Sequence, residues 1–329
     1  MRISLVEKKM RNYNKISRKN IKCPHCSGKN IIKYGQTSRV QAYYCKDCRK
    51  KFTEKGLKNK MYTPRVVINA ITYYNLGNTL EESAKLVNRR FKVKVSKSTV
   101  HSWVKEFSDI CSYSKQRSQV IKRYTTDNII HAFSFQHSGL TYDFQFHLPK
   151  LEMLGSKYPS LIQYLKNMKT RCPSDIFKEN ERCSQIKLGV NIKKQGRYNQ
   201  ACKLAGFALK ACDKNKERHN KVEEFMLIND SSTIACEVPV WYWDKNLDLG
   251  VCGHIDLLQI RQGKIYVLDF KPGAGKEKES KVASQLYLYA TGFSFRTKIP
   301  LQSFCCAWFD ENMYYEFNPA EIKIEMKKH

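Results

Sequence analysis

The stretch GHIDLLQIRQGKIYVLDFK (Gly253–Lys271) decides the fold of the C-terminal part of the chain, because its pattern is that of a β-hairpin. Two apolar runs flank a two-residue turn at Gln262-Gly263. With that turn, Asp256 falls directly opposite Asp269, and the two side chains share one face of the sheet with Cβ atoms about 5 Å apart. Two carboxylates that close repel each other, and a divalent cation between them would relieve the repulsion.

Two more side chains belong to this face if the register holds. Lys271 shares the side of Asp269 because strand side chains alternate, and His254 would lie opposite Lys271. A bulge would shift the register by one residue, and the two acids could instead be ordinary polar residues on a solvated face. Because the strands otherwise have the composition of buried strands, where lone acids are costly, we expect a site for Mg²⁺ or Mn²⁺.

The segments around the hairpin predict a mixed sheet with flanking helices. A long helical stretch over residues 201–230, broken near Asp213, comes first. The following elements are strand STIACEVPVWYW, the two strands of the hairpin, helix KESKVASQLYLYATGF, strand LQSFCCAWF and the short strand MYYEF. This order of helix, three strands, helix and strand predicts an α+β domain over residues 201–329.

Three short motifs in this domain resemble those of a known enzyme family. GHID ending at Asp256, DFK at Asp269–Lys271, and Gln285 followed four residues later by Tyr289 occur in the order GxxD, DxK and QxxxY. In that order they resemble the RecB-like branch of the PD-(D/E)XK nuclease superfamily, over residues 201–317. The resemblance implies a restriction-endonuclease-like α/β core (αβββαβ) that hydrolyses phosphodiesters with Mg²⁺ or Mn²⁺.

The resemblance also implies a role for each motif residue. The catalytic metal would be bound by Asp256, Asp269, the backbone carbonyl of Phe270 and His219. Lys271 would orient the attacking water and stabilise the negative charge that develops at phosphorus. Gln285 and Tyr289 would hold DNA and the active-site strands.

Three further candidates come from neighbouring elements. His219 and Glu223 are four residues apart and therefore share one face of a helix, and the branch often adds a His or an acid from its first helix. Glu237, in CEVPV, matches a glutamate that is common in the first strand.

Two other cofactors are not expected. An iron–sulfur cluster needs a dedicated cysteine group near the C-terminus, where this chain has only the adjacent pair Cys305-Cys306. ATP binding is not expected either, because PGAGKE (residues 272–277) lacks the first glycine and the final Ser or Thr of a P-loop.

Residues 21–60 hold two CxxC pairs that predict a zinc ribbon. The 18 residues between the pairs match structural zinc spacing, and two matched pairs argue against a redox CxxC. The expected ligands are Cys23, Cys26, Cys45 and Cys48. The basic run Arg49, Lys50 and Lys51 would contact DNA phosphates; a ribbon that binds only protein is the alternative.

Residues 61–110 predict a small three-helix helix-turn-helix domain. The first helix fits Pro64–Asn75, and Thr79 with Glu82 forms a capping box for the second. The third runs from Thr99 to about Phe107, capped by Ser96 or Ser98. Its outer face would present Ser98, Thr99, His101, Ser102 and Lys105 to the major groove. A plain three-helix bundle with a solvated polar face is the alternative.

A zinc ribbon followed by a helix-turn-helix resembles the N-terminal DNA-binding part of bacterial and archaeal insertion-sequence transposases. It implies recognition of an element end or a related site. The ribonuclease-H-like domain that follows in those enzymes is not recognisable here. The expected partners are DNA, a second copy of the chain, or proteins of recombination and transposition.

Two segments carry no functional assignment. Residues 1–20 predict a disordered basic tail. Residues 111–200 predict an intermediate α+β region with a hairpin over residues 130–147, a helix at YPSLIQYLKNM and a linker over residues 181–200. The aromatic face of the hairpin could stack on unpaired bases, although such faces are more often core.

The net charge of +29 implies a polyanionic partner, and residues 1–120 hold 28 Lys and Arg against 7 Asp and Glu. No run is apolar enough for a signal peptide or membrane span, so a cytoplasmic, nucleoid-associated protein with reduced cysteines is expected. Together these features predict a metal-dependent DNA nuclease. The alternatives are a non-catalytic DNA-binding regulator or transposition accessory protein, and a nuclease directed at RNA.

Overall fold

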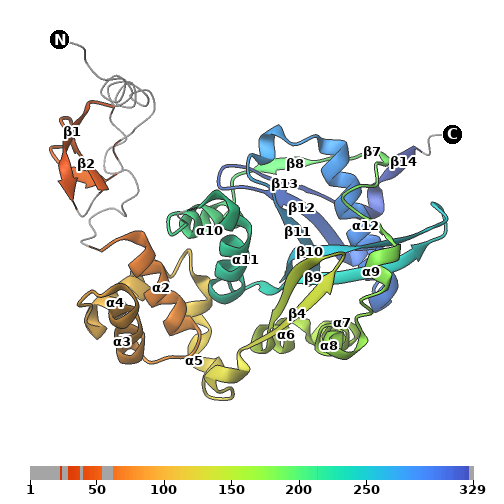
Figure 1. The fold of residues 1–329 in the computed structure, drawn as a ribbon, viewed down its shortest axis with the longest axis horizontal. Coiled ribbons are helices and arrows are strands. Elements are labelled where there is room, and N and C mark those ends of the chain that lie inside the picture. The colour runs from red at the N-terminus through yellow and green to blue at the C-terminus, as the bar shows by residue number, and fades with distance from the viewer. Residues whose placement is uncertain (1–22, 24–28, 38–39, 54–61, 213, 326–329) are drawn as a thin grey trace, which may run out of the picture. The chain divides into compact units, whose positions relative to one another are not determined.

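The computed structural model describes residues 23, 29–37, 40–53, 62–212 and 214–325 (Figure 1). The chain forms two compact units, residues 1–66 and 67–329. It is a mixed α+β protein with a mixed sheet. The structure therefore divides the chain after Val66, and the segments expected as a helix-turn-helix, an intermediate region and a C-terminal domain pack together in the second unit. The basic tail and Cys26 lie outside the described residues.

In the first unit, a small antiparallel sheet holds the second CxxC pair. Its strands are β1 (Ile31–Thr37), β2 (Val40–Cys45) and β3 (Lys51–Thr53), in that order. The Cys45 amide donates to the Lys50 carbonyl at 3.0 Å. This bond closes a tight turn between β2 and β3, as the spacing of the cysteines predicts.

Three helices follow at the expected positions. They are α2 (Pro64–Asn75), α3 (Leu80–Phe91) and α4 (Lys97–Glu106). Thr79 and Glu82 form the predicted capping box at α3. Ser96 caps α4, whose first residue is therefore two positions before the predicted Thr99.

One nine-stranded sheet forms the centre of the second unit. Its path is β4 (Ile130–His137), β5 (Leu140–His147), β9 (Thr233–Asp244), β10 (Leu249–Arg261), β11 (Lys264–Phe270), β12 (Phe304–Phe309), β13 (Tyr314–Phe317) and β8 (Gln195–Arg197), with β6 (Glu181–Arg182) paired to β10. The β11–β12 and β10–β6 pairs are parallel and the other pairs antiparallel, so the sheet is mixed. The predicted order of elements after residue 200 is confirmed.

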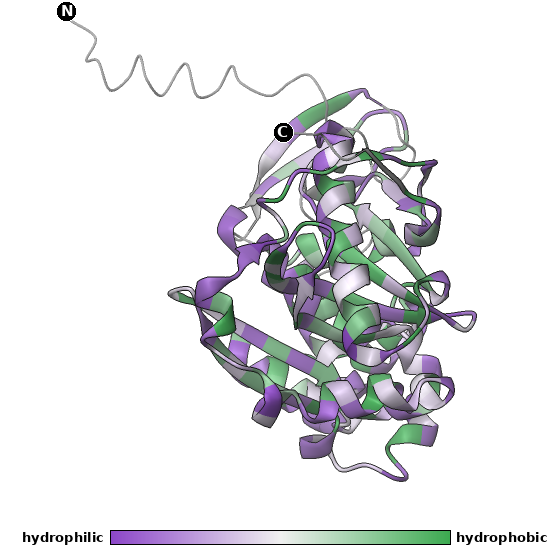
Figure 2. Cartoon of the chain, turned by 90° about the vertical axis from the view of Figure 1, so that its right-hand side faces the viewer, coloured by the Kyte–Doolittle hydropathy of each residue, from purple (hydrophilic) through white to green (hydrophobic). Residues whose placement is uncertain are grey.

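Three longer helices lie beside the central strands. They are α10 (Gln200–Leu209), α11 (Arg218–Asn229) and α12 (Glu279–Thr297). Figure 1 shows α10 and α11 on one side of the central strands and α12 on the other. Figure 2 shows hydrophobic residues along the strands and the helices packed on them. Of the helices in the described part of the chain, none combines the length and apolar character needed to cross a membrane.

Shorter elements complete the second unit. The helices are α5 (Arg117–Val120), α6 (Leu148–Leu154), α7 (Pro159–Lys166), α8 (Met168–Arg171) and α9 (Ile176–Glu179), and β7 (Gly189–Asn191) pairs with β14 (Lys323–Glu325). The prediction of a linker over residues 181–200 is wrong, because this segment contains β6, β7 and β8. Strands of two or three residues are too short to show an alternating pattern in the sequence.

The predicted hairpin over residues 130–147 is confirmed, and it extends the central sheet. Strand β5 pairs with β9, where Gln145 faces Cys236. On its aromatic face Phe144 and Phe146 are buried in the core. These two side chains therefore pack in the core, as expected for most such faces, and are not available to stack on unpaired bases.

Candidate functional site

The hairpin of β10 and β11 has the register that the two-residue turn predicts. The pairs run from Arg261 opposite Lys264 to Leu257 opposite Leu268. Gln262 and Gly263 both have positive φ, of 50° and 71°, as a type I′ turn requires. The register places Asp256 and Asp269 at the open end of the hairpin, on the same face.

One part of the predicted register is wrong, because His254 does not face Lys271. The ladder ends at the Leu257–Leu268 pair, and the Asp256 carboxylate accepts the Phe270 amide proton at 3.0 Å. A side chain therefore takes the place of the next backbone partner, and the strands part before His254. The His254 ring instead stacks on Tyr142, with ring centroids 3.6 Å apart.

Helix α11 brings a histidine and a glutamate to Asp256. His219 Nδ1 lies 3.8 Å from Asp256 Oδ2 and 4.0 Å from Glu223 Oε1. One ligand atom from each of the three side chains lies within 4.8 Å of the others. Glu223 is buried, and its Oε1 has no hydrogen-bond partner among the described residues. An orphaned carboxylate oxygen beside a second acid and an imidazole fits a divalent cation.

Asp269 lies beside this group and is paired with the predicted lysine. It is fully buried, and Lys271 Nζ lies 2.8 Å from its Oδ2 and 3.0 Å from its Oδ1. Burial and the charge of Asp256 raise the pKa of Asp269 well above its usual range. Burial also opposes the charge on Asp256, but the polar neighbours His219 and Asp269 and the charge of Lys271 hold its pKa below the ordinary value. A bound cation would favour the ionised form of both aspartates.

Two more acids surround Asp256, and both have raised pKa values. Burial, followed by the charge of Asp256, raises the pKa of Glu223 well above its usual range. The same two causes raise the pKa of Glu237 to about 8. Such crowding of buried acids disfavours ionisation until a positive charge is present.

Glu237 also has a strained backbone. Its φ of 50° is left-handed, although it lies in the middle of β9 between the pairs Cys236–Leu257 and Val238–Ile255. A non-glycine residue in this conformation costs of the order of 1–3 kcal/mol, and such strain gathers at functional sites.

Gln285 and Tyr289 lie on α12, and the Tyr289 ring packs against β10 of the hairpin. Gln285 Nε2 donates to the Tyr289 hydroxyl at 3.0 Å, and both residues are buried. Tyr289 packs against Gly253, where an added Cβ would lie 2.5 Å from the ring. The glycine of the GHID motif thus makes room for the tyrosine of the third motif. The burial of both side chains favours their expected role in holding strands.

A cavity of about 140 Å³ adjoins the acids and includes residues that sequence reasoning did not single out. Asp256, Glu237 and Tyr289 line it together with His137, Tyr142, Arg182 and His254. His137 and His254 share a hydrogen bond of 2.7 Å between Nδ1 and Nε2. The alternating pattern of residues 130–147 predicts the hairpin that contains His137 and Tyr142. Nothing in the sequence near that hairpin predicts that it lies beside Asp256.

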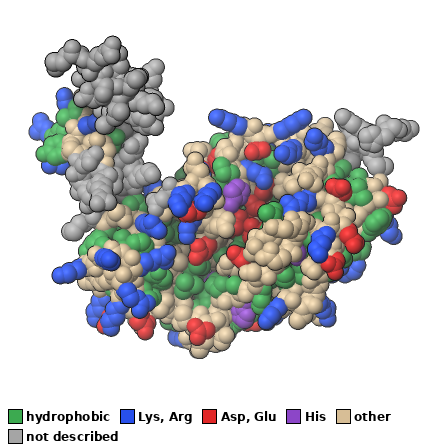
Figure 3. Space-filling model, viewed as in Figure 1, with side chains coloured by type: hydrophobic (Ala, Val, Ile, Leu, Met, Phe, Trp, Pro, Cys, Tyr) green, Lys and Arg blue, Asp and Glu red, His purple; other side chains and the backbone are tan. Residues whose placement is uncertain are grey.

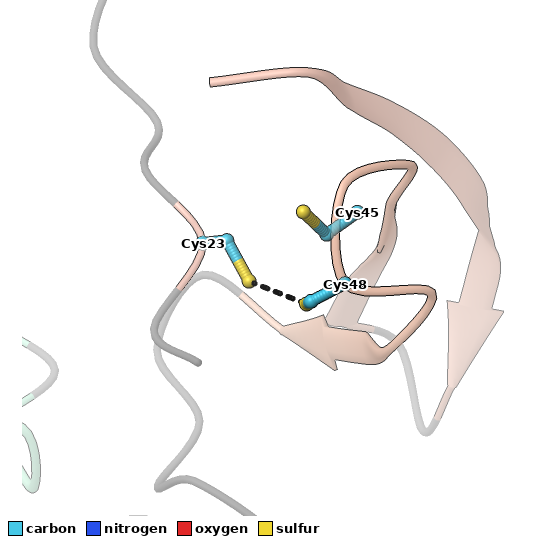
Figure 4. Close-up of side chains that lie close together, drawn as sticks. All are labelled: Cys23, Cys45 and Cys48. Atoms are coloured by element: carbon cyan, nitrogen blue, oxygen red, sulfur yellow. Dashed lines mark hydrogen bonds between the residues drawn. The ribbon is translucent and has the colours of Figure 1, made fainter. Parts of the chain in front are cut away.

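Three of the four predicted zinc ligands are described, and they lie together (Figure 4). The Sγ atoms of Cys23, Cys45 and Cys48 lie within 4.8 Å of one another, and those of Cys23 and Cys48 are 3.5 Å apart. This cluster could hold a metal ion. The fourth predicted ligand, Cys26, lies outside the described residues.

The predicted DNA-contacting residues are at the surface. On α4 the exposed side chains are Ser98, His101, Ser102 and Lys105, with Thr99 half-buried. Val100 and Trp103 are buried on its other face. In the first unit Arg49, Lys50 and Lys51 are exposed. Figure 3 shows acidic side chains gathered near the middle of the second unit, with lysines and arginines around them.

No family model, curated protein or solved structure gives a significant match to this chain. Buried carboxylates, a histidine and a lysine around one point are a set that can bind a divalent cation and stabilise a negatively charged transition state.

Proposed function

We propose that this chain is a metal-dependent DNA nuclease. The observation that carries the proposal is the convergence of the hairpin and α11, which brings Asp256, Asp269 and Lys271 together with His219 and Glu223. Structural ion pairs also perturb pKa values, but a buried acid with an orphaned oxygen beside two further acids is costly without a ligand.

Each residue has a role in this proposal. Asp256, Glu223 and His219 would hold Mg²⁺ or Mn²⁺, with Asp269 beside them, and the Phe270 carbonyl stays a predicted ligand. The bound cation supplies positive charge at the phosphate and lowers the pKa of water. Lys271, held by Asp269, would orient the attacking water and face the charge that develops on the phosphate.

Delivery to DNA is assigned to the N-terminal elements. The cysteine cluster would hold structural zinc, and α4 would enter the major groove. The charge of +29 supports a nucleic-acid partner. A role at mobile-element ends or in genome maintenance is the biological setting that this combination suggests.

The test is cleavage of plasmid, linear duplex, single-stranded DNA and RNA with Mg²⁺ or Mn²⁺. Removing one transition-state stabiliser typically costs about 10²–10³ in rate, so Lys271→Ala should cut at least that much more slowly. Lys264→Ala is the control, because Lys264 is an exposed lysine at the start of β11, the strand that Lys271 follows. If no substrate is cut with either metal but DNA is bound, the regulator alternative holds. Faster cleavage of RNA would favour the RNA nuclease.

A further inference from the structure

The expected DNA-reading helices are joined to the helix that bears His219 and Glu223. Asn75, the last residue of α2, donates from Nδ2 to Asn229 Oδ1 at 2.9 Å, and both side chains are fully buried. Asn229, the last residue of α11, donates in turn to Thr72 Oγ1 at 3.1 Å. Asn229 Nδ2 also donates to the Phe225 carbonyl at 3.0 Å, so both polar atoms of the Asn229 amide have partners. Asn75 Oδ1 has none among the described residues. A slip of α2 against α11 would leave further buried polar atoms unpaired, so the pair favours one geometry.

Further contacts hold the C-terminal end of α11 and the residues that follow it. Ser112 Oγ bonds Ser231 Oγ at 2.9 Å and accepts the Ser231 amide proton at 3.1 Å. The fully buried Lys150 donates to the carbonyls of Leu227 and Asp230 at the C-terminal end of α11. Burial lowers the pKa of Lys150 to about 7, and its amino group lies where a helix C-terminus favours the charged form.

An aromatic row fixes the other end of the helix-turn-helix. Phe107, which caps α4, packs on Phe207 of α10 with ring centroids 4.8 Å apart. Phe207 packs on Phe225 of α11 at 5.8 Å. The helix-turn-helix and the ligand-bearing helix are thus linked at two points, directly through α2 and by way of α10 from the end of α4.

We infer that the protein cuts DNA at a fixed distance from the sequence that α4 reads. The inference rests on the proposed nuclease function and assigns Asn75 and Asn229 as positioning residues. Along α11, Glu223 and His219 precede Asn229 by six and ten residues, which is about 9 and 15 Å of helix. Adding about 10 Å for the packing of α11 on α2, and about 10 Å more to reach α4, places the cut about one turn of B-form DNA from the recognised sequence.

The test needs the recognised sequence first. Full-length Asp269→Asn protein is used to select bound duplexes from a random pool. The selected sequence is then placed at several positions in long DNA of varied sequence, and wild-type cuts with Mn²⁺ are mapped to single nucleotides. The expected result is a narrow set of cuts that moves with the selected sequence.

Variants of the amide pair separate positioning from folding. Asn229→Ala, and the double variant Asn75→Leu with Asn229→Leu, should keep affinity for the selected sequence but lose the narrow cut position. Removing both partners avoids an unpaired buried amide, so the double variant tests the pair without that penalty. Asn69→Ala is the matched control, because Asn69 lies on α2 and accepts from Arg90 of α3. It should leave the cut position unchanged.

The outcomes are distinguishable. Metal-dependent cuts scattered independently of the selected sequence overturn the inference and leave the nuclease function standing. A narrow cut position that survives in both amide variants removes the positioning role of the pair. Selection of no preferred sequence also overturns the inference. The absence of any cleavage overturns both proposals.

Discussion

Glu223 and Glu224 are neighbours on α11 with opposite surroundings. Glu223 is buried beside His219 and Asp256, whereas Glu224 is exposed. A bound cation stabilises the fold by about 2.7 kcal/mol at 100 times its Kd. Thermal unfolding with and without Mn²⁺ should show this stabilisation in wild type and Glu224→Gln, and most of it should be lost in Glu223→Gln. Equal Mn²⁺ stabilisation of the two variants would place the cation elsewhere.

The strained backbone of Glu237 allows a test that separates fold from function. Glycine is ordinarily less favourable than alanine in a strand by about 0.5–1 kcal/mol. At a φ of 50° glycine should instead be more favourable than alanine, so Glu237→Gly should unfold at a higher temperature than Glu237→Ala. Both variants should cut more slowly than wild type. An alanine variant at least as stable as the glycine variant would show that the position is not strained.

The histidine pair beside the site should make the fold sensitive to acid. Burial lowers the pKa of His137 to about 4 from the ordinary 6.5. Between these values the unfolded chain binds a proton that the folded chain does not, so the free energy of unfolding falls as pH falls from about 6.5 to 4. Above pH 6.5 this effect is absent. Urea unfolding of wild type and His137→Gln across pH 4–8 should show a smaller pH dependence in the variant.

At the scale of elements, the cysteine cluster belongs to a unit separate from the catalytic candidate. Cys45→Ser should therefore lose bound zinc, measured by atomic emission, while the main thermal transition of residues 67–329 persists. Cys305→Ser is the control, because Cys305 lies on β12 and bonds the Phe317 carbonyl. Zinc that remains in the Cys45 variant would contradict the metal assignment.

Local patterns were sufficient for the longer helices and strands, but not for the short strands β6, β7 and β8 or for the whole site. The turn at Gln262-Gly263 and the capping box at Thr79 depend on residues a few positions apart, which is why they are readable from sequence. The neighbours of Asp256 on α11 depend on how that helix docks. Arg182 reaches the cavity through the two-residue strand β6, whose parallel pairing with β10 has no local signature.

At the scale of the molecule, positive charge should dominate affinity for DNA. Each lost phosphate contact lowers the slope of log affinity against log salt by about 0.9. Changing Arg49, Lys50 and Lys51 to Gln should flatten that slope, as measured by fluorescence anisotropy on duplex DNA. The same change at three exposed lysines of the second unit, Lys157, Lys169 and Lys264, is the charge-matched control. Equal flattening in both variants would mean that the basic run makes no special contact.

Retargeting this protein to a new sequence would require more than a new recognition helix. A foreign helix-turn-helix joined at residue 110 would replace Asn75 and leave Asn229 Oδ1 buried without its hydrogen-bond donor. An unsatisfied buried amide costs about 1–3 kcal/mol, a large share of the stability of a typical domain. A working chimera would need to carry α2 and its buried asparagine along with the new α4, or replace Asn229 at the same time.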